Sequence, residues 1–317
     1  MKKIILDCDP GHDDMLAIIL ALSNKDLDVL GITTVAGNQT GEKTYVNALR
    51  VLNLIGRSDV KVSRGFDKPI LRELVTAPQI HGVSGLDGAN LPEPKGNETH
   101  KHAVDFIIET VMNSPEKVYL VPTGPLTNVA VSLIKEPRLK DHIEKIVLMG
   151  GAFHDSNFTP GAEFNIYVDP EAAKLVFESG IPIVMVGLDV TNRALLTFED
   201  IDYIESLGGK VSSVIAPLLR FFGKANNEFF GFDGAPIHDA LAVSYLIDPT
   251  ILTLKHLHVD IETKGEFTSG QTVVDYYNVT KKEPNAYVAL DLDLPKFKKL
   301  IIDAIKYFDN IAYVSRF

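Results

Sequence analysis

The stretch DCDPGHDD, residues 7–14, places four carboxylates within eight positions near the start of the chain, between two apolar runs. Asp7 and Asp9 lie two positions apart in a predicted strand, so we expect their side chains on the same face. Asp13 and Asp14 follow a Pro-Gly turn and begin a predicted helix, whose first turn favours anions. The stretch therefore predicts a strand, a tight turn and a helix, with an acidic junction at the edge of the core.

This junction carries more negative charge than helix capping explains. Capping accommodates one or two carboxylates, and four in partial burial are costly unless they share protons or bind a cation. A hard divalent ion suits clustered carboxylates, and the single cysteine leaves no thiolate cluster as an alternative. Calcium is favoured over magnesium if backbone carbonyls and a substrate diol also bind, because Ca²⁺ accepts more ligands and looser geometry.

Outward from the junction, strand-like and helix-like segments alternate as far as residue 192. The predicted strands are residues 2–9, 28–38, 60–65, 117–124, 143–151 and 181–192. The predicted helices between them are residues 13–24, 41–57, 99–115, 125–137 and 169–180. Continuous apolar strands that alternate with helices are typical of parallel sheets covered on both faces. We therefore predict an α/β fold with an open, mostly parallel, Rossmann-like sheet, helices on both faces, and a single domain over residues 1–317.

Other regions depart from this alternation. Residues 66–100 are rich in Gly, Pro, Asn and Asp and predict a long loop, which in a compact domain is usually functional or disordered. Residues 257–277 and 285–293 predict β-hairpin strands at an edge of the sheet, before a final helix over residues 294–308. The aromatic segment 220–232 is interpreted as helical core or as part of a ligand wall.

The bulk composition excludes several classes of partner. The 317 residues include 31 Lys and Arg against 42 Asp and Glu, a formal net charge of −11. Such a chain lacks the basic face that nucleic acids and anionic membranes attract. No apolar run reaches the roughly 20 residues of a transmembrane helix, and no signal-peptide cleavage pattern follows the first residues. We predict a cytoplasmic protein in which Cys8, the only cysteine, is buried and inert.

Ligands of open α/β sheets bind at the carboxyl ends of the strands. Polar residues and glycines gather at the predicted ends: Asp7, Asp9, Asn38, Thr123, Gly124, Gly150, Gly151, Asp189 and Asn192. A second acidic point lies far along the chain, where His238 and Asp239 precede an apolar helical run. Taken alone, Asp239 is a helix N-terminal residue and His238 a core histidine, so neither is specific without the first motif.

Seven segments together resemble the nucleoside hydrolase family of the inosine-uridine type. They are ILDCDPGHDDMLAI (5–18), VAGNQT (35–40), IHGVSGLDG (80–88), VPTGPLTNVA (121–130), IVLMGGA (146–152), AEFNIYVDPEAA (162–173) and PIHDALAV (236–243). They occur in order along nearly the whole chain, and the acidic motif combined with EFNIYVDPEAA is far more specific than a lone DxD. The resemblance implies the nucleoside hydrolase fold, Ca²⁺-dependent hydrolysis of the N-glycosidic bond of ribonucleosides to free base and ribose, and a homotetramer or dimer.

The resemblance also implies roles for individual residues. The Ca²⁺ ligands would be Asp9, Asp14, Asp239 and the backbone carbonyl of Thr123, and Asp9 would also take the proton of a metal-bound water. The ribose contacts would be Asp13, Asn38, Asn157, Glu163 and Asn165, with Met149 against the sugar. His81 and His238 would lie on the base side, and His238 would help the leaving base depart. Asp7 would support the turn, and His12 receives no role.

General chemistry makes these implied roles coherent. Glycosidic hydrolysis passes through an oxocarbenium-like transition state, which carboxylates stabilise. The leaving base needs a proton or comparable stabilisation, and histidine is the usual donor near neutral pH. A crowd of carboxylates without a P-loop or basic clamp repels a phosphate, so we expect a neutral nucleoside as the substrate rather than a nucleotide.

Two alternatives of other classes remain open at this level. A haloacid-dehalogenase-like phosphatase also begins with a strand that ends in DxD, with Asp7 as nucleophile, and a non-catalytic nucleoside-binding protein would keep the metal and the pocket. The base preference is open as well. Asn226, Asn227 and Phe230 are candidates for the base wall where pyrimidine-preferring relatives often carry Tyr or Gln. We favour pyrimidines, chiefly uridine and cytidine, with inosine as a possible further substrate.

Overall fold

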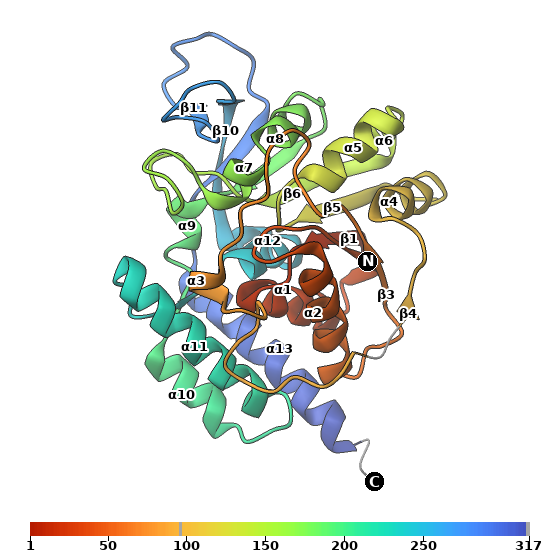
Figure 1. Ribbon diagram of the computed structural model, residues 1–317, viewed down its shortest axis with the longest axis vertical. Helices are drawn as coiled ribbons and strands as arrows, with labels where there is room; N and C mark the ends of the chain where they lie inside the picture. Colours follow the sequence, from red (N-terminus) through yellow and green to blue (C-terminus); the bar gives the residue numbers. More distant parts are fainter. Residues whose placement is uncertain (95–96, 315–317) are drawn as a thin grey trace.

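The computed structural model describes residues 1–94 and 97–314, and its centre is a ten-stranded sheet (Figure 1). Its strands are β1 (Lys2–Cys8), β2 (Leu27–Thr34), β3 (Lys61–Arg64), β4 (Asn97–Glu98), β5 (Val118–Pro122), β6 (Ile143–Met149), β7 (Ile183–Val186), β10 (Leu252–Ile261), β11 (Thr272–Asp275) and β12 (Ala286–Leu292). They are ordered β11-β10-β12-β7-β6-β5-β1-β2-β3-β4. A separate two-stranded sheet joins β8 (Leu195–Thr197) and β9 (Gly234–Pro236).

Most of the large sheet is parallel. β1 pairs in parallel with both β2 and β5, and parallel pairing continues from β2 to β4 on one side and from β5 to β12 on the other. At the far edge β10 runs antiparallel to β12 and to β11. The predicted α/β class, the mostly parallel sheet and the C-terminal edge strands are confirmed.

Helices fill the connections between the strands. They are α1 (His12–Ser23), α2 (Gly41–Leu54), α3 (Pro78–His81), α4 (Ala103–Met112), α5 (Thr127–Lys135), α6 (Leu139–His142), α7 (Phe164–Val168), α8 (Pro170–Phe177), α9 (Leu188–Thr191), α10 (Phe198–Ser206), α11 (Ser212–Phe230), α12 (His238–Ile247) and α13 (Leu294–Val314), with a 3₁₀ turn at Pro249–Ile251. None of the described helices combines the length and the apolar character needed to span a membrane.

The alternation of side chains along β1 divides the core into two layers. Ile4 and Leu6 pack in a cluster with α1, α2, α12 and α13, whereas Ile5 belongs to a second cluster with α4, α5 and α8. Both faces of the sheet are therefore covered by helices, as the sequence predicted. α1 is buried from His12 to Leu22, because it lies between the sheet and the helices α12 and α13.

Two predicted strands are clearly shorter than expected: β2 ends at Thr34 rather than at residue 38, and the strand predicted over residues 181–192 also ends early. Residues 181–192 were expected to be extended, but β7 ends at Val186 and α9 begins at Leu188. The last residue of the neighbouring β6, Met149, pairs with Val186, so no parallel partner continues beyond that point. Asp189 and Asn192 therefore lie in and after a helical turn rather than at a strand end, and this turn carries Thr191 into the interior.

Candidate active site

A cavity of about 270 Å³ lies beyond the carboxyl ends of the parallel strands. Its lining includes ten of the residues to which the resemblance gives a role: Asp13, Asn38, His81, Thr123, Met149, Asn157, Glu163, Asn165, His238 and Asp239. Asn157 comes from the loop before α7, and Asp9 and Asp14 are not among the lining residues. The topology thus gathers at one place residues from the first fifth of the chain to the last quarter.

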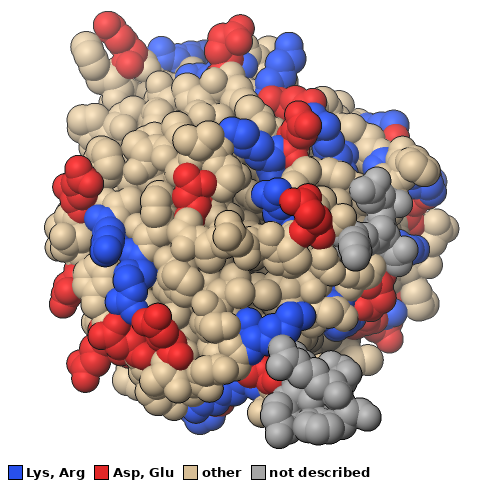
Figure 2. All heavy atoms as spheres, turned by 60° about the horizontal axis from the view of Figure 1, so that its bottom comes forward, with Lys and Arg blue, Asp and Glu red and all other residues tan. Residues whose placement is uncertain are grey.

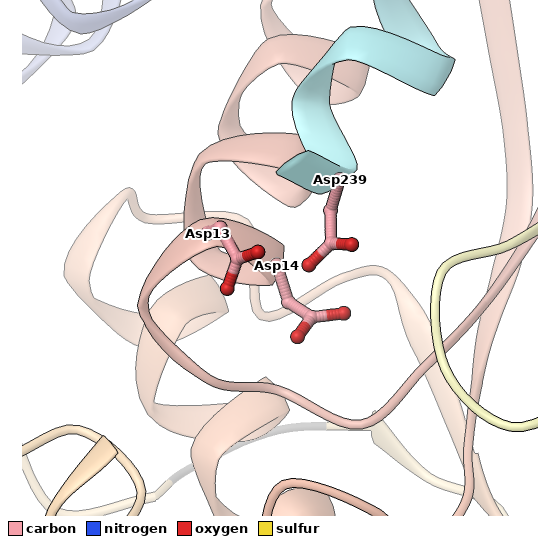
Figure 3. A group of neighbouring side chains, drawn as sticks. All are labelled: Asp13, Asp14 and Asp239. Atoms are coloured by element: carbon pink, nitrogen blue, oxygen red, sulfur yellow. The ribbon is translucent and has the colours of Figure 1, made fainter. Parts of the chain in front are cut away.

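Three carboxylates form an acid group at the cavity, and two of them, Asp13 and Asp239, line it. Asp13 and Asp14 occupy the first turn of α1, and Asp239 occupies the first turn of α12, which packs beside it. An oxygen from each lies within 4.8 Å of an oxygen from the others, and Figure 3 shows the three side chains turned toward one another. Two helix N-termini therefore meet at one point and partly offset the negative charge.

Burial and mutual repulsion act on these acids together. Burial, followed by the charge of Asp13 and Asp14, raises the pKa of Asp239 well above its usual range. Burial and then the charge of Asp14 raise the pKa of Asp13 to about 7, and burial also raises the pKa of Asp14. A divalent cation would favour the charged forms again, so the group is electrostatically suited to a metal.

Asp9 lies next to this group in a narrow glycine-lined cradle. The backbone N–H of Asn38 donates to Asp9 Oδ2 at 2.7 Å, while the buried Oδ1 has no hydrogen-bond partner among the described residues. A Cβ added at Gly124 would lie 2.7 Å from Asp9 Oδ1, and one added at Gly37 would overlap Asp9 Oδ2. Burial and the charge of Asp14 raise the pKa of Asp9 well above its ordinary value. The free oxygen of Asp9 is available to a metal or to a proton.

Asp7 and Thr123 support the junction from behind. Asp7 Oδ1 accepts hydrogen bonds from the Thr33 hydroxyl at 2.6 Å and from Asn128 Nδ2 at 2.8 Å, so it joins β1 to β2 and α5. The Asp7 carbonyl accepts from the backbone N–H of Thr123 at 2.8 Å. The Thr123 hydroxyl in turn donates to Asp14 Oδ1 at 2.8 Å. Asp7, like Asp9 and Asp14, is not among the residues that line the cavity.

Across the cavity from the acid group lie the carboxyl group of Glu163 and the uncharged amide of Asn165. Glu163 accepts from the backbone N–H groups of Gly151 and Asn165, both at 2.9 Å, and burial raises its pKa to about 7. Asn165 Nδ2 donates to the Thr123 carbonyl at 2.7 Å. Glu163 caps the short helix α7, and Phe164 lines the cavity too.

A stack of rings closes the far wall. His81 is buried in the short helix α3, and its ring stacks on His12 and Phe222 with centroids 5.5 and 5.1 Å away. Its Nδ1 lies 3.2 Å from His12 Nδ1, and His12 Nε2 lies 2.8 Å from the Asp87 carbonyl. Burial lowers the pKa of both histidines, that of His12 to about 4. His12, given no role by its position in the motif, holds the cavity-lining His81.

The C-terminal end of α11 supplies an aromatic wall. Phe222, Asn226, Phe229 and Phe230 line the cavity, and Asn226 Nδ2 donates to the Phe222 carbonyl at 3.0 Å. The candidates Asn226 and Phe230 are therefore at the cavity. Asn227 is not, because it faces solvent and donates to the Phe232 carbonyl at 2.8 Å. Successive residues of an α-helix point about 100° apart around its axis, so these adjacent asparagines point in different directions.

His238 is the first residue of α12 and lines the cavity between the acids and the aromatic wall. Its Nδ1 lies 2.8 Å from the hydroxyl oxygen of Thr191, and burial lowers its pKa to about 4. The sequence did not single out Thr191 or Phe158, whereas Phe222 lies in the aromatic segment 220–232 that was interpreted as helical core or as part of a ligand wall. Only the folded arrangement of α9 and the loop before α7 brings Thr191 and Phe158 to the site.

The comparisons with known proteins agree with this arrangement. The family model described as inosine-uridine preferring nucleoside hydrolase matches residues 4–299. A relative named pyrimidine-specific ribonucleoside hydrolase RihA, from Escherichia coli O9:H4 (strain HS), is 49% identical over 306 residues, which cover 96% of this chain and 98% of the relative.

Solved structures share the fold over the whole chain. The structure of a purine-preferring ribonucleoside hydrolase from Gardnerella vaginalis aligns with a TM-score of 0.92 and 36% identity, covering 98% of this chain and 100% of that one. An inosine-uridine preferring nucleoside hydrolase from Bacillus anthracis aligns with a TM-score of 0.80 over 97% of this chain. At 20% identity, that second likeness concerns the fold alone.

Proposed function

The chain belongs to the inosine-uridine preferring nucleoside hydrolase family, and we propose that within it the protein is a Ca²⁺-dependent hydrolase of pyrimidine ribonucleosides. The reaction cleaves the N-glycosidic bond and releases the free base and ribose. The observation that carries the proposal is the buried acid group of α1 and α12, which opens into a cavity with an aromatic wall on its far side. Family membership rules out the phosphatase alternative.

The donor set fits a hard cation. The donor atoms of the proposed ligands are all oxygens, and buried oxygens of Asp9 and Asp13 lack partners among the described residues. Asp9, Asp14, Asp239 and the Thr123 carbonyl would hold Ca²⁺, and Asp13 lies close enough to join them or to face the ribose. The Thr123 carbonyl already accepts from Asn165 and keeps a second lone pair. When bound, the ion orients the ribose hydroxyls and lowers the pKa of the attacking water.

The other parts of the proposed reaction are carried out by side chains of the protein itself. Asp9 Oδ1 is the free carboxylate oxygen that takes the proton of the attacking water. Asp13 and Glu163 place negative charge around the sugar, where positive charge develops as the bond breaks. Asn38, Asn157 and Asn165 offer amides to the ribose hydroxyls, while His238 and His81 stand on the side of the base.

The preference for pyrimidines rests on the relative named pyrimidine-specific, and the wall of α11 provides the means. The amide of Asn226 keeps hydrogen-bonding groups beyond its bond to the Phe222 carbonyl, so it can pair with the edge of a small base. Phe222 and Phe230 offer ring faces on which a base can stack. The purine-preferring relative, at 36% identity, is more distant than the 49% relative.

A ribose-release assay tests the function directly. The protein is incubated with uridine, cytidine, inosine and adenosine, with Ca²⁺ or with a chelator, and reducing sugar and free base are quantified. We expect ribose from uridine and cytidine above inosine and adenosine. Binding of uridine without ribose release would instead support the nucleoside-binding alternative.

We predict strong discrimination against nucleotides. The described residues that line the cavity include Asp13, Glu163 and Asp239 but no Lys or Arg, so a 5′-phosphate would enter an acidic pocket without a counter-charge. The kcat/KM of uridine should exceed that of uridine 5′-monophosphate by at least about a hundredfold, since placing like charges together costs several kcal/mol. Release of uracil, followed by absorbance, measures both. Similar values for the two substrates would contradict the prediction.

The charges elsewhere on the surface fit the same class of substrate. On the face drawn in Figure 2, the described Lys and Arg side chains are interspersed with Asp and Glu rather than gathered into one basic field. Such a mixed surface offers no continuous track for a phosphate backbone. A small neutral ligand, and not a nucleic acid, is the partner that this face and the acidic net charge support.

A second prediction concerns Gly37 and Gly124, the glycines that form the cradle around Asp9. In Gly124→Ala the new methyl group would meet Asp9 Oδ1 at 2.7 Å and Val35 Cγ1 at 3.0 Å, so the carboxylate must move. Because a displacement of about 1 Å at a catalytic group can cost a hundredfold, we expect kcat for uridine to fall by about that factor. Gly161→Ala is the matched control, since its Cβ would make only an ordinary contact at 3.7 Å. Equal activity of the two variants would contradict the prediction.

A further inference from the structure

Thr191 is a fully buried residue at the end of α9, and its side chain touches His238. Its Oγ1 lies 2.8 Å from His238 Nδ1, although the two residues are far apart in the chain. His238 lines the cavity, and among the described residues its ring makes a hydrogen bond at Nδ1 and none at Nε2. The His238 ring is thus fixed by a hydrogen bond at Nδ1, and Nε2 remains free to form a hydrogen bond with a ligand in the cavity.

The hydrogen atoms of this contact can be assigned by counting. A threonine hydroxyl carries one hydrogen, which in a buried site needs an acceptor. Among the described residues, the hydroxyl of Thr191 makes no other side-chain hydrogen bond than the one to Nδ1. If the ring donated instead, the hydroxyl hydrogen would be left without an acceptor. The hydroxyl therefore donates, Nδ1 accepts, and the ring hydrogen sits on Nε2.

We infer that Thr191 is a positioning residue for the reaction: its hydroxyl donates to His238 Nδ1 and so presents Nε2–H to the leaving base. This inference rests on the proposed function. In the step, the oxygen of water bonds to C1′ of the ribose, and the bond from C1′ to the base nitrogen breaks with its electron pair on the base. The proton of the water goes to Asp9. His238 keeps its hydrogen and stabilises the growing negative charge on the base by a hydrogen bond.

A neutral histidine that donates a hydrogen bond differs from a histidine that transfers a proton. The donor role requires one tautomer, and that tautomer depends on a hydrogen-bond donor behind the ring. A hydroxyl at position 191 supplies that donor, whereas a methyl group of the same shape does not. The contribution of Thr191 should therefore appear only with substrates whose leaving group needs stabilisation.

The test compares Thr191→Val, which keeps the shape and loses the hydroxyl, with Thr191→Ser, which keeps the hydroxyl. Each Ca²⁺-loaded enzyme is assayed with uridine and with p-nitrophenyl riboside, whose leaving group departs without help. For Thr191→Val we expect kcat for uridine to fall between about tenfold and about a hundredfold, with KM and the p-nitrophenyl riboside rate within about twofold. Thr191→Ser should recover kcat for uridine to within about threefold of the wild type.

Equal losses on both substrates, or an unchanged uridine rate in Thr191→Val, would overturn the inference. Failure of the wild type to release ribose from any nucleoside would refute the proposed function instead. If Thr191→Val does not fold, nitrogen-15 NMR of the histidine rings in the wild-type holoenzyme decides, with His238→Gln used for assignment. A hydrogen on His238 Nε2 supports the inference, and a hydrogen on Nδ1 overturns it.

Discussion

Replacing Asp9 by Asn should lower kcat for uridine by at least about three orders of magnitude, because it removes both a metal ligand and the acceptor of the water proton. The substitution keeps the size of the side chain and its contact with the Asn38 N–H, so the cradle between Gly37 and Gly124 stays filled. Steady-state kinetics with uridine measure the loss, and near-unchanged circular dichroism would show that the fold survives.

Asp7→Asn is the matched control for this experiment. Asp7 is as deeply buried and lies two positions away, but it contacts Thr33 and Asn128, whereas Asp9 contacts the cavity-lining Asn38. An asparagine can still accept from both neighbours, so activity should stay within about tenfold while Tm falls by a few degrees. If Asp9→Asn kept most of its activity, or if both variants lost activity equally, the assignment of Asp9 would be wrong.

Asp239→Asn should abolish the response of the protein to calcium. In the wild type, binding of Ca²⁺ to the buried acids should raise Tm by several degrees, since a ligand that binds only the native state stabilises it. The variant loses one ligand, and we expect kcat/KM to fall by about three orders of magnitude. Calorimetric melting with and without Ca²⁺, together with the uridine assay, measures both effects.

The same substitution should have the opposite effect on the calcium-free protein. Burial, followed by the charges of Asp13 and Asp14, raises the pKa of the Asp239 carboxyl there, and asparagine removes the buried acid that these effects disfavour. The variant should therefore melt at or above the temperature of the chelated wild type, although it is inactive. Asp248→Asn, at the other end of α12 and outside the cavity, should behave as the wild type in both assays. A variant that still gained several degrees with Ca²⁺ would refute the metal assignment.

The sequence predicted the part of the site that follows local rules. The acidic junction at residues 7–14 combines a strand, a Pro-Gly turn and a helix start, and each is readable from neighbouring residues. The apolar helix that follows Asp239 identified it only as a helix N-terminal residue. The partnership of this residue with α1 depends on the packing of α12, which the resemblance implied and no local pattern revealed.

The parts that were missed depend on tertiary contacts. Thr191 belongs to a segment that reads as strand, and it becomes helical because β6 offers no partner beyond Met149. Asn226 and Asn227 look equivalent in sequence, but the orientation of α11 places only the first at the cavity. The role of His12 depends on the stacking of its ring on the ring of His81, a contact between segments far apart in the sequence. Propensity and motif spacing do not encode which faces of distant elements meet.

The packing of α1 against α12 also bears on how the protein becomes active as it is made. Asp14 and Asp239 are separated by more than two hundred positions, so a growing polypeptide on the ribosome has the first carboxylates long before it has the last. Pairing of such distant segments is slow, because the chain loses conformational entropy in closing a large loop before any contact between the segments stabilises it. Calcium binding should therefore be a late event of biosynthesis, and stalled nascent chains that end before α12 should neither retain the ion nor turn over uridine.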